Sequence, residues 1–506
     1  MVPPEPRLPE ARGLVRQGMY FVVHAPRQSG KTTTLSALAT DLTAEGDAVA
    51  LRFSCERAKV ANDDYAAAEL QVLEAIAEAA DEASLTPELM PPSPWPQASP
   101  GSRIRAGLTA WTRSCPRPLV LFFDEIDALR GESLISVLAQ LRDGYSSRPE
   151  NFPASIVLCG LRDVRDYKAA AGGDPARLGT SSPFNIKVGS LQLNSFTPEQ
   201  VTDLYWQHTA ETGQEFTPAA TERAYNYTQG QPWLVNALAY EIIDRMVVTG
   251  PVLPEHVDTA KERLILARAT HLDSLAARLS EPRVKKIIEP LIAGTIPPLD
   301  TTYDDDASYV QDLGLIARGN PVRVANPIYK EVIIRVLGAA VERIITDKPQ
   351  AFLLPDGRLD IRKMLEAFAA FWKENGDIIA GSMEYHEVAP QLVLMAFLHR
   401  IVNGGGYIDR EYGLGRGRTD LLIRKPYGDG QLQKEALELK VWRRGRKDPL
   451  DEGLDQLDQY LGRLGLDHGT LVIFDRRDPE PASEGPAIDF SDTTTPADRT
   501  VTLLRA

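Results

Sequence analysis

The amino-acid sequence predicts a multidomain α/β chain, and three observations support this prediction. The chain has 506 residues, which exceeds the size of one compact core and suggests about three or four domains. Short apolar runs typical of buried strands alternate with helical patterns. The content of 43% hydrophobic and 25% charged residues is that of ordinary globular protein, which argues against a mainly disordered, collagenous or coiled-coil chain.

The sequence also argues against a membrane, disulfide-bonded or zinc-binding protein. No apolar run approaches the roughly 20 residues needed to cross a bilayer, and residues 1–9 lack the apolar core of a secretory signal. We therefore expect a cytoplasmic protein with no membrane partner. Cys55, Cys115 and Cys159 form no Cys-x-x-Cys pair, and we expect all three to be reduced core residues. The net charge of −14 favours solubility and argues against non-specific coating of nucleic acid.

The first candidate site follows a short apolar run at residues 19–24, which predicts a strand. A loop containing Gly and Lys comes next, and a helical pattern begins at Thr33. In such a loop, backbone N–H groups surround a phosphate, Lys31 reaches the β- and γ-phosphates, and the Thr32 hydroxyl binds Mg²⁺. Ala25 stands where the phosphate-loop motif, Gly-x-x-x-x-Gly-Lys-Ser/Thr, has its first Gly. The candidate ATP-binding residues of the loop are Ala25, Pro26, Arg27, Gln28, Ser29, Gly30, Lys31, Thr32 and Thr33.

A second apolar run, residues 118–123, ends in Asp124 and Glu125. This is the Walker B pattern, in which Asp124 would hold Mg²⁺ through water and Glu125 would polarise the attacking water. An acidic pair after a strand is often only a surface feature. Together with the phosphate loop upstream, however, the pair favours an ATPase.

A third strand is predicted at residues 154–160, and a helix with its N-cap at Thr197 follows. Residues 230–235 begin another helix and resemble the Gly-x-Pro signature in the helical lid of AAA-like and signal-transduction ATPases. Three arginines could touch a γ-phosphate, although we favour solvated surface positions for them: Arg162, Arg165 and Arg177.

The second candidate site lies in a basic segment, residues 409–447, whose net charge is +5 within the acidic chain. Such a segment favours an anionic polymer as partner, while solvated strand and turn positions are the plainer alternative. Within it, Glu438 and Lys440 alternate to one face of a predicted strand, and Asp420 begins the preceding strand. Asp420, Glu438 and the Leu439 carbonyl would bind Mg²⁺, with Mn²⁺ as the alternative, while Lys440 would orient or activate water for phosphodiester hydrolysis.

Neighbouring segments supply further candidates for this site. Leucines at intervals of three and four predict an amphipathic helix over residues 450–464, on which Gln456 and Tyr460 lie one turn apart. A buried strand is predicted at residues 470–475. Upstream, Glu387 precedes a helix at residues 390–398 and could point at the same metal. The order helix, strand, strand, helix, strand is that of an α/β nuclease core.

Residues 350–477 resemble the PD-(D/E)XK nuclease superfamily, especially the carboxy-terminal domain of prokaryotic AAA-like ATP-binding proteins. The resemblance rests on segments 355–360, 403–406, 410–412, 415–418 and 472–477, on the helix after Glu387, and on the spacing of Asp420, Glu438 and Lys440. It implies that these three residues form the catalytic centre, that Glu387 joins the metal site, and that Gln456 and Tyr460 mark a subgroup. Asp420 follows Thr rather than Pro, a relaxed form of the motif.

Composition shifts suggest where four predicted domains meet, and the resemblance to known families implies what each domain is. They are an AAA-like ATPase core at residues 1–195, a helical lid at 196–275, a winged-helix-like domain at 276–345, and a PD-(D/E)XK nuclease-like domain at 346–506. The winged helix could touch DNA, but the acidic residues 304–306 favour a packing or signalling module.

The leading hypothesis is an ATP- and Mg²⁺-dependent nuclease in which nucleotide state regulates cleavage of nucleic acid, with DNA preferred as substrate. The resemblance implies a setting in defence against foreign DNA or in mobile-element processing. Two alternatives are a nucleotide-switched binding protein with an inactive nuclease fold and an ATP-driven motor that remodels DNA. Homo-oligomerisation and a regulatory protein partner are left open by the sequence.

Overall fold

The computed structural model consists of two compact units. It describes residues 2–3, 5–161, 189–267, 270–293, 304–319, 322–342, 345, 348–382, 389–402, 407–411, 420–428, 431–477 and 489–506. Unit 1 comprises Met1–His271, Thr301–Arg318 and Ala325–Ile328. Unit 2 comprises Leu272–Asp300, Gly319–Val324 and Tyr329–Ala506.

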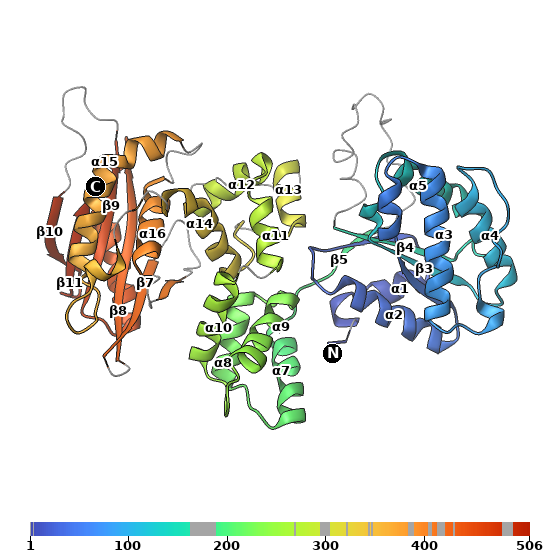
Figure 1. Cartoon of the computed structure of the whole chain (residues 1–506), viewed down its shortest axis with the longest axis horizontal. Helices are drawn as coiled ribbons and strands as arrows, with labels where there is room; N and C mark the ends of the chain where they lie inside the picture. The colour runs from blue at the N-terminus through green and yellow to red at the C-terminus, as the bar shows by residue number, and fades with distance from the viewer. Residues whose placement is uncertain are drawn as a thin grey trace. The chain divides into compact units, whose positions relative to one another are not determined.

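A parallel five-stranded sheet of order β2-β3-β4-β1-β5 forms the centre of unit 1 (Figure 1). Its strands are β1 (Phe21–His24), β2 (Val49–Ser54), β3 (Leu119–Asp124), β4 (Ser155–Gly160) and β5 (Gly189–Gln192). Its helices are α1 (Ala11–Arg16), α2 (Lys31–Glu45), α3 (Tyr65–Glu82), α4 (Arg103–Ser114) and α5 (Gly131–Gly144). Because all strands run parallel, the carboxyl ends of β1, β2 and β3 emerge at one edge of the sheet, where open α/β sheets bind ligands.

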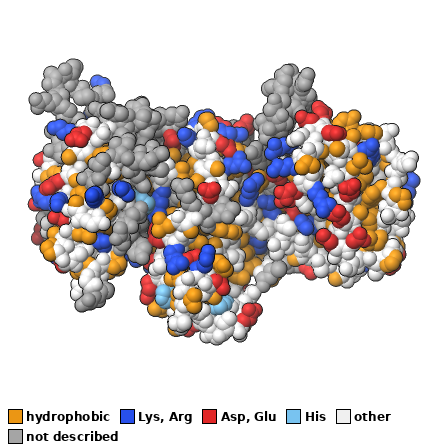
Figure 2. Space-filling view, viewed as in Figure 1, with side chains coloured by type: hydrophobic (Ala, Val, Ile, Leu, Met, Phe, Trp, Pro, Cys, Tyr) orange, Lys and Arg blue, Asp and Glu red, His pale blue; other side chains and the backbone are white. Residues whose placement is uncertain are grey.

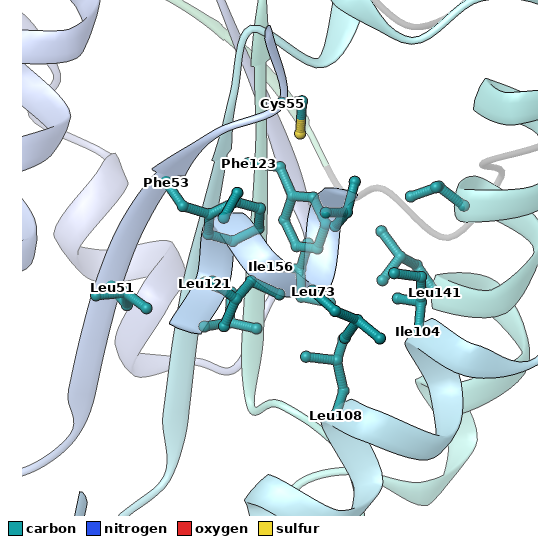
Figure 3. Packing of buried hydrophobic residues seen from close by; sticks show 14 of the residues in the cluster. Leu51, Phe53, Cys55, Leu73, Ile104, Leu108, Leu121, Phe123, Leu141 and Ile156 are labelled. Carbon is teal, nitrogen blue, oxygen red and sulfur yellow. The ribbon is translucent and has the colours of Figure 1, made fainter. Parts of the chain in front are cut away.

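Both faces of this sheet are buried, as expected for a parallel sheet between helices. Leu121 and Phe123 pack toward α3, α4 and α5, whereas Val120 and Phe122 pack on the other face with α1 and α2. Figure 3 shows the first of these clusters, in which the rings of Phe53 and Phe123 meet edge to face with centroids 4.6 Å apart. Each such aromatic or leucine side chain contributes about 1.5–3 kcal/mol by burial. The predicted P-loop α/β architecture is therefore present.

Among the described helices that follow the sheet in unit 1, α7 to α10 each have Pro in the first turn, where no hydrogen-bond donor is needed. They are α7 (Pro198–Thr212), α8 (Pro218–Thr228), α9 (Pro232–Tyr240) and α10 (Pro254–Leu266). Thr197 forms the predicted cap of α7: its hydroxyl accepts from the Gln200 N–H, while the Gln200 side chain accepts from the Thr197 N–H. This capping box confirms the sequence interpretation of where α7 begins.

The segment predicted as a winged helix contains α11 (Thr270–Arg278), α12 (Pro282–Ala293), α13 (Asp305–Asp312) and α14 (Pro327–Glu342). In the described residues between α13 and α14, extended pairing is limited to single bridge residues at Ile316 and Val324. A two-stranded wing needs longer strands, so these elements do not confirm a winged helix.

Unit 2 contains a mixed six-stranded sheet of order β10-β11-β9-β8-β7-β6. Its strands are β6 (Tyr407–Glu411), β7 (Asp420–Tyr427), β8 (Gln431–Arg443), β9 (His468–Arg476), β10 (Asp489–Thr494) and β11 (Thr500–Arg505). Its helices are α15 (Ile361–Ser382), α16 (Ala389–Val402) and α17 (Leu450–Leu464). The strands β8, β9 and β11 are parallel, and α17 connects β8 to β9. The order α16, β6, β7, β8, α17, β9 contains the predicted core order with one additional strand.

Two hydrophobic layers hold the sheet of unit 2. On one side, Tyr460 and Leu457 of α17 pack against Leu471 and Ile473 of β9. Aromatic rings form the other layer, where Phe368 of α15 lies 5.6 Å from the Phe397 ring of α16 and 6.1 Å from the Phe474 ring of β9, measured between centroids. The face carrying α17 is the one on which the second candidate site is built.

The cysteines are buried and free, as the sequence predicted. Among the helices of the described residues, none combines the length and apolar character needed to span a bilayer. On the face shown in Figure 2, acidic and basic side chains are interspersed over unit 1 rather than gathered into fields of one sign.

Candidate functional site

The phosphate loop of unit 1 connects the end of β1 to the start of α2. The Ala25 N–H continues the ladder of β1 by donating to the Gly160 carbonyl at 3.3 Å. The chain then passes through positive φ angles at Gln28 (56°) and Gly30 (82°), and α2 begins at Lys31. Gly30 is suited to this conformation because it has no Cβ. Ala25 at the position of the usual first Gly is therefore compatible with the turn, which has its left-handed residues further along.

Lys31 lies across the loop that precedes it. Its Nζ donates to the carbonyls of Ala25 at 2.7 Å and Pro26 at 2.9 Å. Burial lowers the pKa of Lys31, while nearby Asp127, Asp124 and Glu125 act in the opposite direction. The ammonium group thus sits inside the loop that would surround a phosphate.

Asp124 and Thr32 meet at the edge of the sheet. The Thr32 Oγ1 donates to the Asp124 Oδ2 at 2.7 Å, and Arg52 Nη1 lies 3.1 Å from the same oxygen. The other oxygen, Oδ1, accepts from the Glu125 N–H at 3.0 Å. Asp124 is only 1% exposed. The Thr32 hydroxyl and the Asp124 carboxylate are therefore adjacent. Both offer oxygen atoms, the ligands that Mg²⁺ prefers.

Glu125 stands beside this pair in a left-handed backbone conformation, with φ 54°. The Ser54 hydroxyl donates to its Oε2. This contact follows from strand register, because Ser54 at the end of β2 is opposite Asp124 at the end of β3. The two acidic residues predicted at the end of the strand thus have separate partners.

The cysteines near this edge are not nucleophiles. Burial is the main cause that raises the pKa of Cys55 and Cys159, and the negative charge of Asp124 is the second. Both therefore remain neutral thiols at neutral pH, and thiols are weakly reactive.

The start of α9, within the region predicted as a helical lid, contacts the phosphate loop through the Gly-x-Pro run. The Gln231 Nε2 donates to the Gln28 carbonyl at 3.4 Å, and the Gln231 Oε1 accepts from the Leu234 N–H at 2.6 Å, capping α9. Gly230 has φ 71°. The predicted run at residues 230–235 therefore begins a helix and reaches the loop. The candidate arginines Arg162, Arg165 and Arg177 lie outside the described residues.

The second candidate site is built on β7, β8 and α17. Backbone register places Asp420 directly opposite Glu438. Lys440 is two residues along β8, and its Nζ lies 3.1 Å from the Glu438 Oε1. Glu438 is fully buried, and Lys440 is 8% exposed. Glu438 and Lys440 therefore lie on one face of the strand, as predicted, and form an ion pair. Leu439, which lies between them in the sequence, is buried, and its side chain belongs to the opposite face of the strand.

Helix α17 completes the surroundings of Lys440. The Lys440 Nζ donates to the Gln456 Oε1 and lies 3.5 Å from the Glu452 Oε1, to which the Gln456 Nε2 donates at 2.8 Å. Gln456 therefore contacts the predicted centre directly. Tyr460 is fully buried one turn further along, with its ring in the hydrophobic cluster of α17.

Part of this site lies outside the described residues. Glu387 is one such residue, and for Asp420 only the backbone is described. Within the described residues, no group of three or more Asp, Glu, His or Cys side chains could hold a metal ion. Of the predicted basic segment, the exposed cations that the structure describes are Lys434, Arg444, Arg446 and Lys447.

Several residues of these sites were not identified from the sequence. Ser54 and Arg52 contact the acidic pair, and the apolar alternation of residues 49–53 could have revealed the strand that carries them. Glu452 contacts Lys440 from the first turn of α17. Arg7 binds the phosphate loop from a segment that has no recognisable motif.

No family model matches the chain, and no curated protein matches it. Among solved structures, it is similar to the Walker-type ATPase paby2304 of Pyrococcus abyssi, at 15% identity and a TM-score of 0.45 over 65% of this chain and 95% of that one. It is also similar to the RuvB Holliday junction branch migration motor of Thermotoga maritima, at 16% identity and a TM-score of 0.33 over 63% and 90%. Another similar structure is Cdc6p of Pyrobaculum aerophilum, at 13% identity and a TM-score of 0.36 over 67% and 96%.

Proposed function

We propose that this chain binds and hydrolyses ATP in unit 1 and cleaves nucleic acid, with DNA as the substrate, in unit 2. The cleavage depends on Mg²⁺ and is regulated by the nucleotide state of unit 1. The observation that carries the first half is the hydrogen bond between Thr32 and Asp124 beside the Lys31 loop. The observation that carries the second half is the buried pair of Glu438 and Lys440 on β8, with position 420 opposite.

In unit 1, each group would have a distinct task. Lys31 and the loop N–H groups would bind the phosphates, and the helix start at Gly30 adds a favourable partial charge. The Thr32 hydroxyl and the Asp124 carboxylate fit Mg²⁺ as oxygen ligands, and the ion when bound would offset phosphate charge. Glu125 would orient the attacking water and accept its proton.

In unit 2, the donor set suits phosphodiester hydrolysis. The carboxylates of Asp420 and Glu438 and the Leu439 carbonyl would hold Mg²⁺ or Mn²⁺, which would polarise the scissile phosphate. Lys440 would orient the attacking water and stabilise charge that develops on the phosphate. Gln456, hydrogen-bonded to the Lys440 ammonium, would fix its direction. Glu387 and Tyr460 are the remaining members of the proposed site.

One experiment tests both halves. Purified full-length wild type, Lys31→Ala, Lys440→Ala and a control Lys434→Ala are incubated with end-labelled DNA and Mg²⁺, with and without ATP, while phosphate release is measured in parallel. Lys434 is an exposed lysine on the same strand, so its loss controls for charge alone. We expect Lys440→Ala to lose cleavage by roughly 100-fold or more and to keep ATP hydrolysis. Lys31→Ala should lose ATP hydrolysis and the effect of ATP on cleavage.

Other outcomes would distinguish the alternatives. Cleavage by Lys440→Ala at the wild-type rate would contradict the catalytic assignment. Tight, salt-sensitive DNA binding without product under any divalent metal would indicate a binding protein with an inactive nuclease fold. ATP hydrolysis strongly stimulated by long DNA, without cutting, would indicate a remodelling motor.

A further inference from the structure

Arg7 ends a short 3₁₀ helix, η1 (Glu5–Arg7), and is 4% exposed. Its guanidinium group donates to oxygens from two distant parts of unit 1. Nη2 donates to the Ser29 carbonyl at 2.6 Å, and Nη1 donates to the Thr34 Oγ1 at 3.2 Å. Nε and Nη2 donate to the Asn194 carbonyl at 3.1 Å and 2.8 Å. One side chain therefore joins the phosphate loop, the first turn of α2 and the segment that leaves β5.

The Phe196 ring and the glycine at position 30 also border the guanidinium group. Its Cζ lies 4.9 Å from the centroid of the Phe196 ring, which precedes the cap of α7. A Cβ added to Gly30 would lie 3.1 Å from the Arg7 Nη1, so the glycine leaves room for the cation. Burial lowers the pKa of Arg7 to about 10, which leaves the group charged at neutral pH. A planar guanidinium group carries five N–H donors in a rigid fork and so fixes the directions of its acceptors, whereas the three donors of an ammonium group can rotate.

The hydrogen bond to Ser29 determines how the next amide points. In a planar trans peptide, the C=O and the N–H lie on opposite sides of the chain. Since the Ser29 carbonyl faces Arg7, the Gly30 N–H must point away from Arg7. The positive φ of Gly30 permits this arrangement at the start of α2. An amide at this place is one of those that a phosphate loop offers to its ligand.

We propose that Arg7 is a positioning residue of the nucleotide site. It fixes the peptide between Ser29 and Gly30 so that the Gly30 N–H is held toward a bound nucleotide phosphate, and it links that peptide to residues 194–196 at the base of the lid. The inference rests on the proposed ATP binding of unit 1 and adds a residue that lies outside the loop motif and outside the acidic pair.

The test measures ATP affinity and turnover on the full chain. The variants are Arg7→Met, which keeps length and removes the donors, Arg7→Lys, which keeps the charge, and Thr34→Val, which removes one acceptor and keeps volume. The control is Arg16→Met on α1, where an exposed arginine pairs with Glu45. Dissociation constants come from calorimetry with ATP and Mg²⁺, KM and kcat from phosphate release, and folding from circular dichroism and thermal unfolding without nucleotide.

We expect Arg7→Met to weaken ATP binding by roughly 10- to 100-fold, the range of one or two charge-assisted hydrogen bonds. Arg7→Lys should recover part of this loss, and Thr34→Val should lose about 2- to 5-fold. Arg16→Met should bind like wild type. A merely structural role would lower thermal stability and leave the affinity of the folded protein unchanged.

Folded Arg7→Met with wild-type ATP affinity would overturn the inference. If Arg7→Met does not fold, wild-type affinity in both Arg7→Lys and Thr34→Val would overturn it instead. Failure of the wild-type chain to bind ATP would refute the proposed function itself, and this result is distinguishable because it does not depend on any variant.

Discussion

Glu125 is held in place by a residue from a neighbouring strand. It adopts a left-handed backbone conformation, which costs about 1–2 kcal/mol for a residue with a Cβ and is concentrated at functional sites. Side chains of β2 bind the two acidic residues individually: Arg52 contacts Asp124, and Ser54 contacts Glu125. The carboxylate that would accept a proton therefore has a different partner from the carboxylate that would hold Mg²⁺.

Loss of the Ser54 hydroxyl should therefore impair turnover without impairing binding. For Ser54→Ala we expect kcat of ATP hydrolysis to fall by roughly 3- to 10-fold, because Glu125 loses a hydrogen-bond donor worth about 1 kcal/mol, while the ATP dissociation constant stays within about twofold of wild type. Steady-state phosphate release and calorimetry measure the two quantities.

A double-mutant cycle with Glu125→Gln shows whether Ser54 acts through Glu125. In the Glu125→Gln background, Ser54→Ala should have no further effect on the residual rate. Ser36→Ala, a half-buried serine of α2, is the control and should turn over like wild type. An equal loss of rate with and without Glu125 would show that Ser54 acts on something else.

Individual site residues could be predicted where the signal is local. Lys31, Thr32 and Asp124 follow apolar runs that identify their strands. In the structure Thr32 is hydrogen-bonded to Asp124, and Lys31 is near enough to interact with the charge of Asp124. Ser54 depends on the register between β2 and β3, and Arg7 depends on contacts with residues far along the chain. Neither register nor long-range contact is encoded in a short pattern, so both residues were missed.

Gly230, just before α9, brings the chain close to the backbone of Phe196, just before α7. Its φ of 71° disfavours any residue with a Cβ, and a Cβ there would lie 1.9 Å from the Phe196 carbonyl oxygen. That oxygen belongs to backbone, which cannot rotate away as a flexible side chain could. Phe196 in turn donates its N–H to the Gly230 carbonyl at 2.8 Å.

We expect Gly230→Ala to destabilise unit 1 by roughly 2–4 kcal/mol, because it adds a backbone clash to the conformational strain. Gly213→Ala is the matched control, since Gly213 also has positive φ, 78°, but an added Cβ would meet nothing within 4 Å. Its cost should be about 1 kcal/mol. Thermal or denaturant unfolding compares the two, and equal losses would show that the contact with Phe196 has no energetic weight.

Elements with strong local signals were predicted best. The capping box at Thr197 gave the start of α7, and the leucine spacing gave α17 over the same residues, 450–464. A winged-helix-like domain at residues 276–345 would need a two-stranded wing, and between α13 and α14 the described residues contain only single bridge residues. Strands β10 and β11 were not predicted. β10 is polar and largely exposed at the sheet edge, so it leaves little apolar periodicity, whereas the buried Val501, Leu503 and Leu504 of β11 could have indicated a strand.

The net charge of the whole chain and the local charge of one segment give different information about this molecule. The net charge is −14, yet residues 409–447 have a net charge of +5. In this segment Lys425 and Lys440 are buried, so their charges lie in the interior of unit 2. The exposed turn after β8 carries Arg444, Arg446 and Lys447 beside the proposed catalytic strand. Phosphate contacts by such exposed cations depend on salt, because binding releases counterions from the nucleic acid.

The turn after β8 should therefore contribute a measurable part of the salt dependence of DNA binding. Neutralising Arg444, Arg446 and Lys447 to Gln together should weaken binding at low salt and reduce the slope of log affinity against log salt by about 2 to 3, since each phosphate contact contributes about 0.9. Neutralising the exposed cations Arg358, Arg362 and Lys363 of the same unit removes equal charge and is the control. Anisotropy with labelled DNA and without divalent metal separates binding from cleavage. Equal slopes for the two triple variants would mean that global charge, rather than this turn, governs the encounter with DNA.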